Sequence, residues 1–409
     1  MSQQHKRIPI PKSLTQGHLE TQESLLEIQR EPDGLFIGIP RESIMQENRV
    51  ALVPSSVRTL TGQGHRILME TGAGVKSRFT DNEYSEAGAE MVATKREVYE
   101  ADVILKVSPP TIEEIDLMRP NQILISPLHL PILTAEYINK LRKKKVIALA
   151  MEYIQDASGS YPVVRIMSEL AGMAAMLTGA ELLSNSAGGN GVLLGGISGV
   201  PPAKVVILGA GMVAEYAVRT ALGLGAEVRI FDNNIYKLKR IQDQVGRQLY
   251  TSAINPVYLE DELVQADLAI GAIHSPSGRT QVIVNEDMVM KMKPGSVIVD
   301  VSIDQGGCFA TSEITTLDKP TFVKHDVIHY CVPNIASKYP RTASIAVSNI
   351  LTPLILRAAE TGGMEPLLYS HRGLRHGIYV YKGSLTNTYL GKRFDIKSTD
   401  IDLLITSIL

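Results

Sequence analysis

The sequence predicts an α/β protein built from more than one domain, and three observations support this prediction. The chain has 409 residues, a length that suits two or three domains. Short apolar segments with the composition of buried parallel strands alternate with segments of helical composition. A turn containing glycines follows one of these strands, and an acidic residue ends the next strand. With 44% apolar residues, the chain can bury sizeable cores.

The first half of the chain has the strand and helix alternation of a parallel sheet. Residues 1–34 are polar and are expected to form an extension, partly helical over 20–30. The predicted strands that follow are 35–39, 66–70, 103–107, 122–125 and 146–150, and the predicted helices are 55–63, 95–100 and 134–143. Because this half has no glycine fingerprint, it is not expected to hold a dinucleotide.

The second half begins with a long helix, expected over 166–184, whose small residues suit close packing or a crossing between domains. The strands expected after it are 205–208, 227–231, 268–272 and 297–301, and the expected helices are 215–223 and 343–360. If the chain returns to the first domain through the last of these helices, residues 362–409 complete that domain.

The most informative segment joins a strand to a helix through two glycines. Gly209 and Gly211 permit a tight turn and a close backbone approach, and Ala214 is small where the helix packs on the strand. Such a turn places the pyrophosphate of a dinucleotide at the helix N-terminus. Asp232, at the end of the next strand, suits the ribose hydroxyls and repels a 2′-phosphate, which predicts NAD as the cofactor. An ordinary strand–turn–helix unit without a ligand is the alternative interpretation.

Composition argues against several other classes of protein. The 41 basic and 43 acidic residues nearly cancel, so nucleic acid is not an expected partner. Two cysteines, Cys308 and Cys331, give neither a disulfide framework nor a multi-cysteine zinc site, and no metal is expected. No apolar run approaches ~20 residues and the first residues are polar, so neither a membrane span nor a secretory signal is expected. These features fit a cytoplasmic protein.

Polar residues just after predicted strands are candidates for chemistry, because ligands of parallel sheets bind outside the carboxyl ends of the strands. His129 and Asp304 occupy such positions, and Arg49 follows the loop after the first strand. A histidine can transfer protons near neutral pH, and a carboxylate can orient it or hold a cationic intermediate. A guanidinium suits a substrate carboxylate. By position alone, a packed histidine and a surface ion pair are the simpler interpretations of His129 and Arg49.

Several segments of the sequence resemble the alanine dehydrogenase family, whose near relative is the α subunit of proton-translocating transhydrogenase. These segments are Ile37-Gly-Ile-Pro-Arg-Glu42, Asn48-Arg-Val-Ala-Leu52, Glu70-Thr-Gly-Ala-Gly74, Leu128-His-Leu130, Met167-Ser-Glu-Leu-Ala-Gly172, Gly191-Val-Leu-Leu-Gly-Gly196, Gly209-Ala-Gly211, Met292-Lys-Pro-Gly295 and Ile303-Asp-Gln-Gly-Gly-Cys308. Together they are highly specific. The last of them is more similar to alanine dehydrogenases than to transhydrogenase subunits.

The resemblance implies an α/β fold of two Rossmann-like, doubly wound, parallel-sheet domains with a cleft between them. Residues 35–165 plus 345–409 would form the substrate domain and residues 166–344 the NAD-binding domain. The implied activity is the reversible, NAD-dependent oxidative deamination of L-alanine to pyruvate and ammonium. No membrane partner is implied, and the implied assembly is a homo-oligomer, commonly a hexamer.

The resemblance also implies roles for individual residues. Arg49 matches the arginine that binds the substrate carboxylate, His129 the general acid/base, and Asp304 the acid beside the nicotinamide. The remaining matches, Ser168, Asp232, Lys237 and Asn334, correspond to cofactor contacts.

One position departs from the family pattern. Family members carry a catalytic lysine as the second lysine of Lys-Val-Lys-Glu-Pro, whereas this chain reads Lys106-Val-Ser-Pro-Pro110 and places Ser108 there. Loss of such a cation could cost on the order of a hundredfold in rate. Lys106 lies on the same strand face by alternation, but the family motif already has a lysine at that position, which argues against Lys106 as a replacement for the missing cation. Two further interpretations therefore stay open: a dehydrogenase of another amino or oxo acid, and an NAD(H)-binding protein of low activity.

Overall fold

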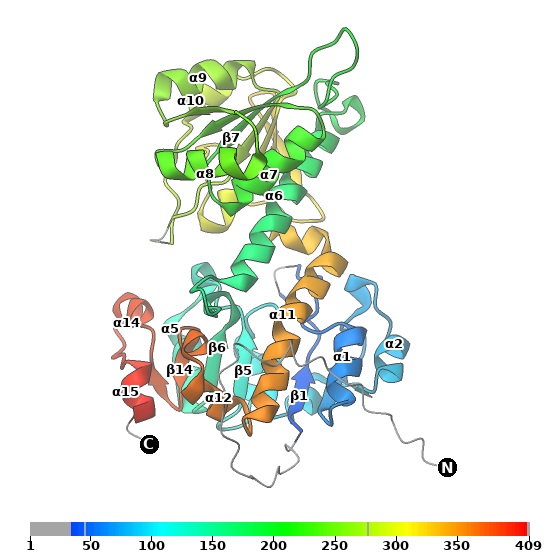
Figure 1. Ribbon diagram of the computed structural model, residues 1–409, viewed down its shortest axis with the longest axis vertical. Coiled ribbons are helices and arrows are strands. Elements are labelled where there is room, and N and C mark those ends of the chain that lie inside the picture. Colours follow the sequence, from blue (N-terminus) through cyan, green and yellow to red (C-terminus); the bar gives the residue numbers. More distant parts are fainter. Residues whose placement is uncertain (1–33, 45, 276–277, 407–409) are drawn as a thin grey trace. The chain divides into compact units, whose positions relative to one another are not determined.

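The computed structural model describes residues 34–44, 46–275 and 278–406 (Figure 1). The polar extension predicted over 1–34, including its helical part, lies almost entirely outside these residues. The chain forms two compact units, one from the residues up to Val164 together with those from Pro340, the other from Arg165 to Tyr339. The sequence placed the two divisions between 165 and 166 and between 344 and 345.

The described residues of unit 1 form an eight-stranded sheet. Its strands are β1 (Phe36–Ile39), β2 (Arg66–Glu70), β3 (Glu90–Val92), β4 (Val103–Leu105), β5 (Ile123–Ser126), β6 (Ile147–Ala150), β14 (Ile378–Tyr381) and β15 (Ser384–Leu385). They are arranged in the order β15-β14-β6-β5-β4-β1-β2-β3. Strands β1 to β6 are parallel, and β14 and β15 add an antiparallel edge. The strand order reverses between β1 and β4, which is where a doubly wound sheet opens a crevice for ligands.

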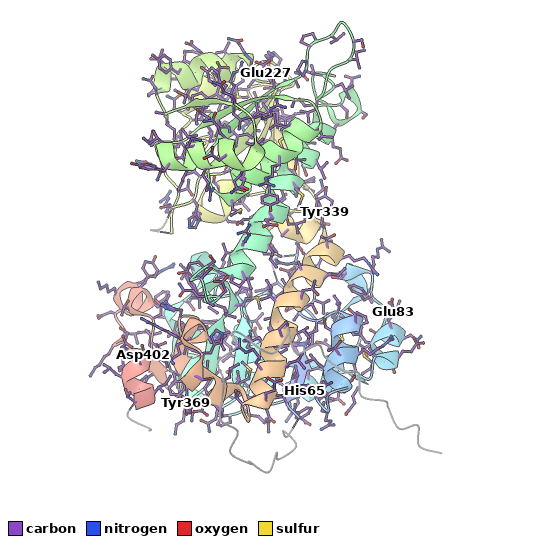
Figure 2. All side chains as sticks on the ribbon, viewed as in Figure 1. His65, Glu83, Glu227, Tyr339, Tyr369 and Asp402 are labelled. Carbon is purple, nitrogen blue, oxygen red and sulfur yellow. The ribbon has the colours of Figure 1, made fainter. Side chains whose placement is uncertain are left out.

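Helices connect and cover these strands. The helices of unit 1 are α1 (Pro54–Thr61), α2 (Asp81–Glu86), α3 (Lys95–Val98), α4 (Ile112–Leu117), α5 (Ala135–Lys143), α11 (Pro340–Glu360), α12 (Met364–Ser370), α13 (Arg372–Arg375), α14 (Thr388–Phe394) and α15 (Ile401–Thr406). The sequence Thr-x-x-Glu starts α2, α3 and α4, and each start forms a reciprocal capping box. Asp402, labelled in Figure 2, pairs with Arg375 at 2.7 Å and so ties α15 to α13.

The described residues of unit 2 form a seven-stranded sheet. Its strands are β7 (Lys204–Leu208), β8 (Glu227–Phe231), β9 (Tyr250–Ser252), β10 (Leu268–Gly271), β11 (Val297–Asp300), β12 (Thr321–Lys324) and β13 (Val327–Tyr330). Their order is β12-β13-β11-β10-β7-β8-β9, with only β12 antiparallel among them. The helices of this unit are α7 (Met212–Gly223), α8 (Ile235–Val245), α9 (Pro256–Gln265) and α10 (Glu286–Met290). The order of the parallel strands is that of a dinucleotide-binding fold and reverses between β7 and β10.

Both faces of the second sheet are buried. In β7, Val205 and Ile207 join one hydrophobic cluster, whereas Val206 and Leu208 join another. Alternate residues point to opposite faces of a strand, so each cluster covers one face of the sheet. A continuous apolar run such as Val-Val-Ile-Leu is therefore required here rather than a polar/apolar alternation. The predicted class of two doubly wound α/β domains is confirmed.

Most predicted strands and helices are present, with small differences at their ends. The strands without a prediction are the short ones, β3 and β9, and those at the antiparallel edges, β12 to β15. Their pairing and burial depend on neighbouring strands from other segments of the chain, which the local pattern does not reveal.

Two helices are long and apolar enough to cross a membrane, by length and composition alone. Among the described residues, α6 (Pro162–Leu182) and α11 each have 21 residues and a window of mean hydropathy 1.3. About half of each window is buried in the protein, 50% for α6 and 56% for α11, as core helices also are.

Candidate functional site

The glycine turn of unit 2 has the geometry that a close backbone approach requires. Gly209 follows β7 with a φ of +104°, a conformation that favours glycine. A Cβ at Gly209 would lie 2.4 Å from the carbonyl oxygen of Ala272, the residue after β10. The glycine is therefore needed to bring the turn against the neighbouring strand at the point where the sheet order reverses.

The protein's own structure does not require a glycine at position 211, the N-cap of α7. Its φ is −77°, which any residue adopts, and a Cβ there would meet nothing within 4 Å. The folded chain thus leaves room beside Gly211, and the positive end of the α7 dipole lies there, as an anionic phosphate needs. Ala214 is fully buried one turn later, where α7 packs on the sheet.

Asp232 lies at the carboxyl end of β8 and holds the glycine turn. Its Oδ2 accepts a hydrogen bond from the backbone N–H of Ala210 at 2.7 Å, and its Oδ1 accepts from the N–H of Asn234 at 2.7 Å. A carboxylate in this position brings a negative charge to the edge of the turn. The residues therefore fit a dinucleotide whose ribose carries free hydroxyls rather than a phosphate.

Two further predicted cofactor residues lie in unit 2, one on α6, which begins in unit 1, and one on α8. Ser168 is half-buried on α6, and Lys237 is exposed on α8. Burial and then the charge of Lys237 lower the pKa of His274, which follows β10. Lys237 and His274 are therefore close enough to interact electrostatically.

Asp304 and Asn334 are brought together by the structure. Asp304 lies in a 3-10 turn after β11, and its Oδ1 accepts the backbone N–H of Asn334 at 2.9 Å. Asn334 has a left-handed conformation with φ 57°, which asparagine tolerates better than most residues. Both residues follow neighbouring parallel strands, which explains why they meet at the same edge of the sheet.

The loop that carries Asp304 is organised by Asp300, a residue that sequence reasoning did not single out. This fully buried carboxylate accepts hydrogen bonds from the backbone N–H groups of Ser302 at 3.0 Å and Cys308 at 2.8 Å, and from the Ser312 hydroxyl at 2.7 Å. Burial raises the pKa of Asp300 despite these donors. Glycine at 307 permits this loop, since a Cβ there would lie 2.9 Å from Asp300 Oδ2.

In unit 1, Arg49 is half-buried and forms a two-point ion pair with Glu47. Its Nε and Nη2 donate to the two carboxylate oxygens of Glu47 at 2.7 and 2.6 Å, and its own backbone N–H donates to Oε1 at 2.9 Å. The Glu47 side chain is 1% exposed. Glu47 therefore fixes the plane of the guanidinium. Sequence reasoning did not single out Glu47, although its position two residues before Arg49 was a signal for this ion pair.

His129 lies at the end of β5 in a left-handed conformation, with φ 48° and ψ 70°. Glu152, which follows β6, supports this turn because its Oε1 accepts the N–H of Leu128 at 2.7 Å and of His129 at 3.4 Å. Burial, and secondarily the positive charge of Arg49, lower the pKa of His129. The structure thus brings Arg49 and His129 within electrostatic range, with the imidazole held in its neutral form at neutral pH.

Ser108 is buried and donates its hydroxyl hydrogen to Glu42 Oε2. Glu42 also accepts the backbone N–H of Val107 at 2.7 Å and the Lys106 ammonium at 2.8 Å. Burial alone would lower the pKa of Lys106, but Glu42 and Glu114 raise it overall. Lys106 is therefore committed to a buried ion-pair network. The interpretation of Lys106 as a substitute for the missing lysine is not supported.

Arg49, Ser108 and His129 all follow strands β1, β4 and β5 at the carboxyl end of the sheet. This is the edge where the strand order reverses and where α/β proteins bind small molecules. Among the described residues, no group of three or more His, Cys, Asp or Glu side chains is arranged to hold a metal ion.

Comparisons with known proteins agree with this arrangement. The family model "Alanine dehydrogenase/PNT, N-terminal domain" matches residues 38–171, and the corresponding C-terminal domain model matches residues 175–388. Alanine dehydrogenase 2 of Staphylococcus aureus (strain USA300) is 41% identical over 368 residues, which is 90% of this chain and 98% of that protein.

Solved structures give the same picture. An L-alanine dehydrogenase is 38% identical with a TM-score of 0.82, over 88% of this chain and 99% of that chain. A transhydrogenase from Sinorhizobium meliloti is 25% identical with a TM-score of 0.72, over 86% of this chain and 99% of that chain. The fold, the site residues at the sheet edges and these similarities lead to one conclusion: the chain belongs to the alanine dehydrogenase/PNT family.

Proposed function

We propose that the protein is an NAD-dependent alanine dehydrogenase that interconverts L-alanine and water with pyruvate and ammonium. The observation that carries this proposal is the similarity to alanine dehydrogenases along nearly the whole chain, combined with retention of Arg49, His129 and Asp304. An oxidoreductase acting on amino acids is the class that these relatives support.

NAD is the coenzyme that the residues of unit 2 fit best. The turn at Gly209, the room beside Gly211 and the α7 N-terminus suit the pyrophosphate, and the Asp232 carboxylate suits a ribose without phosphate. We assign Ser168, Lys237 and Asn334 as further contacts. The chemistry that NAD supplies when bound is acceptance of a hydride from the substrate carbon.

The two glycines provide a test that separates binding from folding. Gly211→Ala is expected to leave thermal stability nearly unchanged, because its φ suits alanine and its Cβ meets no atom of the protein. The new methyl group would occupy the space of the pyrophosphate, so NADH affinity should fall about tenfold or more. Gly209→Ala should lower both stability and affinity, because of its positive φ and its contact with Ala272. NADH fluorescence titration and thermal unfolding measure the two effects; undiminished affinity in Gly211→Ala would contradict the assignment.

In unit 1, Arg49 and His129 supply substrate binding and proton transfer. Arg49, oriented by Glu47, binds the carboxylate of alanine or pyruvate through its guanidinium. His129 is neutral at neutral pH because burial and Arg49 lower its pKa. A neutral imidazole can accept a proton from the substrate ammonium or from the water that attacks the imine carbon, and later return it to the departing ammonia.

For Asp304, in unit 2, we propose the acidic role that the family resemblance implies. Its position is fixed from two sides, by the Asn334 N–H on Oδ1 and by the Asp300-centred loop. We assign it the role of stabilising the cationic iminium that forms when the Cα–H bond of alanine breaks.

A second candidate function rests on Ser108. Because its hydroxyl hydrogen is donated to Glu42, its oxygen can only accept a hydrogen bond from a ligand, whereas the family lysine donates one. The pocket therefore lacks a cationic donor at this position. This favours, as the alternative, a dehydrogenase of another amino or oxo acid, or an NAD(H)-binding protein that turns over slowly.

The decisive experiment follows NADH absorbance with purified protein, pyruvate and ammonium, then NAD with L-alanine, beside a panel of other amino and oxo acids. Turnover of pyruvate and alanine is the expected result, with NADPH bound about tenfold or more weakly than NADH because Asp232 repels the 2′-phosphate. Faster turnover of another acid would favour the second candidate. NADH binding without any turnover would favour a binding protein, and absence of NADH binding would contradict the proposal.

We also propose a cytoplasmic homo-oligomer, with a hexamer as the expected assembly, on the basis of the family resemblance. The small-molecule partners are L-alanine, pyruvate and ammonium. Size-exclusion chromatography with light scattering tests the assembly, and a monomer at micromolar concentration would contradict it.

A further inference from the structure

Two buried serines from distant segments brace the backbone on either side of Arg49. Ser77 lies in a 3-10 turn (Val75–Ser77) after β2, and Ser344 lies in the first turns of α11. Both side chains are fully buried. Neither serine contributes to the proposed chemistry directly, so their position beside the Arg49 segment needs another explanation.

The hydrogen bonds between these groups have a defined direction. The Val50 N–H donates to Ser344 Oγ at 2.9 Å, and Ser77 Oγ donates to the carbonyl oxygen of Asn48 at 2.8 Å. The two serine oxygens lie 2.9 Å apart. A hydroxyl has one hydrogen, and that of Ser77 goes to Asn48, so Ser344 must donate to Ser77. The chain of hydrogen bonds therefore runs from the Val50 N–H through the two serine hydroxyls to the carbonyl oxygen of Asn48.

We propose that Ser344 and Ser77 are positioning residues for the substrate carboxylate, acting through Arg49; this inference rests on the proposed function. Glu47 orients the guanidinium, whereas the serine pair fixes the backbone from which Arg49 extends. Guanidinium–carboxylate recognition depends on geometry, because two parallel hydrogen bonds must form together. A small shift of the backbone at Arg49 is therefore expected to weaken carboxylate binding.

The same helix offers a matched control. Ser348 lies one turn after Ser344 and is also fully buried. Its Oγ accepts the N–H of Val53 at 3.1 Å and donates to Ser56 Oγ at 2.7 Å. Ser344→Ala and Ser348→Ala thus remove equivalent hydrogen bonds between α11 and the same segment, but only the first removes the support beside Arg49.

The test compares these two variants with the wild type in pyruvate binding, measured as KM and, by calorimetry on the NADH complex, as Kd. Ser344→Ala should raise both about tenfold, on the scale expected when a buried donor loses its partner, with kcat and NADH affinity unchanged. Ser348→Ala should lose similar thermal stability while its pyruvate constants stay within about twofold of the wild type. Equal effects in both variants, or unchanged pyruvate binding in Ser344→Ala, would overturn the inference.

Arg49→Lys separates this inference from the proposed function. A lysine keeps the charge but cannot form the two-point contact, so pyruvate binding should weaken at least as much as in Ser344→Ala. If Arg49→Lys leaves pyruvate binding unchanged, or if the wild type binds no pyruvate, the role of Arg49 fails and the inference fails with it. If Arg49→Lys weakens binding but the two serine variants behave alike, only the serine inference fails.

Discussion

Replacement of His129 by asparagine is expected to lower kcat for alanine oxidation about a thousandfold, within the range typical for loss of a general acid/base. Asparagine is the appropriate substitution because it tolerates the left-handed conformation of residue 129 and so preserves the turn. NADH affinity should not change, because the proposed NADH-binding residues all lie in unit 2. Steady-state kinetics and NADH titration measure the two quantities. Residual activity above a tenth of the wild-type value would contradict the role of His129.

The control for this variant is His376→Asn, since His376 is exposed at the end of α13 and is expected to have no effect. The pH dependence gives an independent check. Burial, followed by the charge of Arg49, lowers the pKa of His129 below the usual 6.5. Activity that needs the neutral imidazole is therefore present above this lowered pKa and lost as pH falls through it. The acid limb of kcat/KM for alanine oxidation should have its midpoint below 6.5 and should be absent from His129→Asn.

Replacement of Lys106 by methionine is expected to destabilise the protein by about 3–5 kcal/mol at neutral pH, the usual cost of removing one partner from a buried ion pair. The Lys106 ammonium is completely buried and lies 2.8 Å from Glu42 Oε2 and 3.4 Å from Glu114 Oε2. Methionine fills a similar volume, so the loss comes from two carboxylates left in an apolar environment rather than from a cavity. Denaturant unfolding at neutral pH measures the change.

The pH dependence of this loss identifies its cause. Burial opposes the charge of Glu114, but Lys106, Lys95 and Thr111 together lower its pKa below the usual 4.5. In the wild type, the stability that ionised Glu114 contributes is fully present above pH 4.5 and is lost as pH falls through the lowered pKa. Without Lys106, the pKa of Glu114 rises, so protonation relieves the buried charge. The difference between Lys106→Met and wild type should therefore shrink as pH falls from 8 toward 5.

A surface pair provides the control for Lys106. Lys140 lies 2.6 Å from Asp116, but these side chains are 28% and 57% exposed. Lys140→Met should change the unfolding free energy by less than about 1 kcal/mol, because solvent screens an exposed pair. Equal effects of the two substitutions would mean that burial of the network is not the source of its energy.

The positions of many candidate site residues could be predicted, because these residues follow strands that the local sequence pattern reveals. Asp232 comes directly after a strand, His129 and Asp304 follow theirs within a few residues, and parallel strands place such residues at one edge of a sheet. The positive φ of Gly209 and the room beside Gly211 agree with the roles that the glycine spacing indicated. These features depend on a few neighbouring residues, which is why one sequence is enough to find them.

The supporting residues could not be predicted, since their partners are remote in sequence. Glu152 holds the turn at His129 from 23 residues away, and Ser344 supports Val50 from 294 residues away. Nothing in the composition around Glu152 or Ser344 distinguishes them from a solvated glutamate or a helix serine. The commitment of Lys106 to Glu42 and Glu114 was likewise invisible, because strand alternation gives the direction of a side chain but not the charges that surround it.

The sequence by itself determined the α/β class, the glycine turn with its acidic partner and the residues at the strand ends, because strand periodicity and glycine conformation are local properties. Only the tertiary structure decided that Ser108 donates to Glu42, and that the Lys106 ammonium is paired with Glu42 and Glu114 in a buried network. It also decided that Arg49 is held by Glu47 and that two serines support its backbone. These are properties of charges and hydrogen bonds in a buried environment, and burial arises only when distant segments pack together.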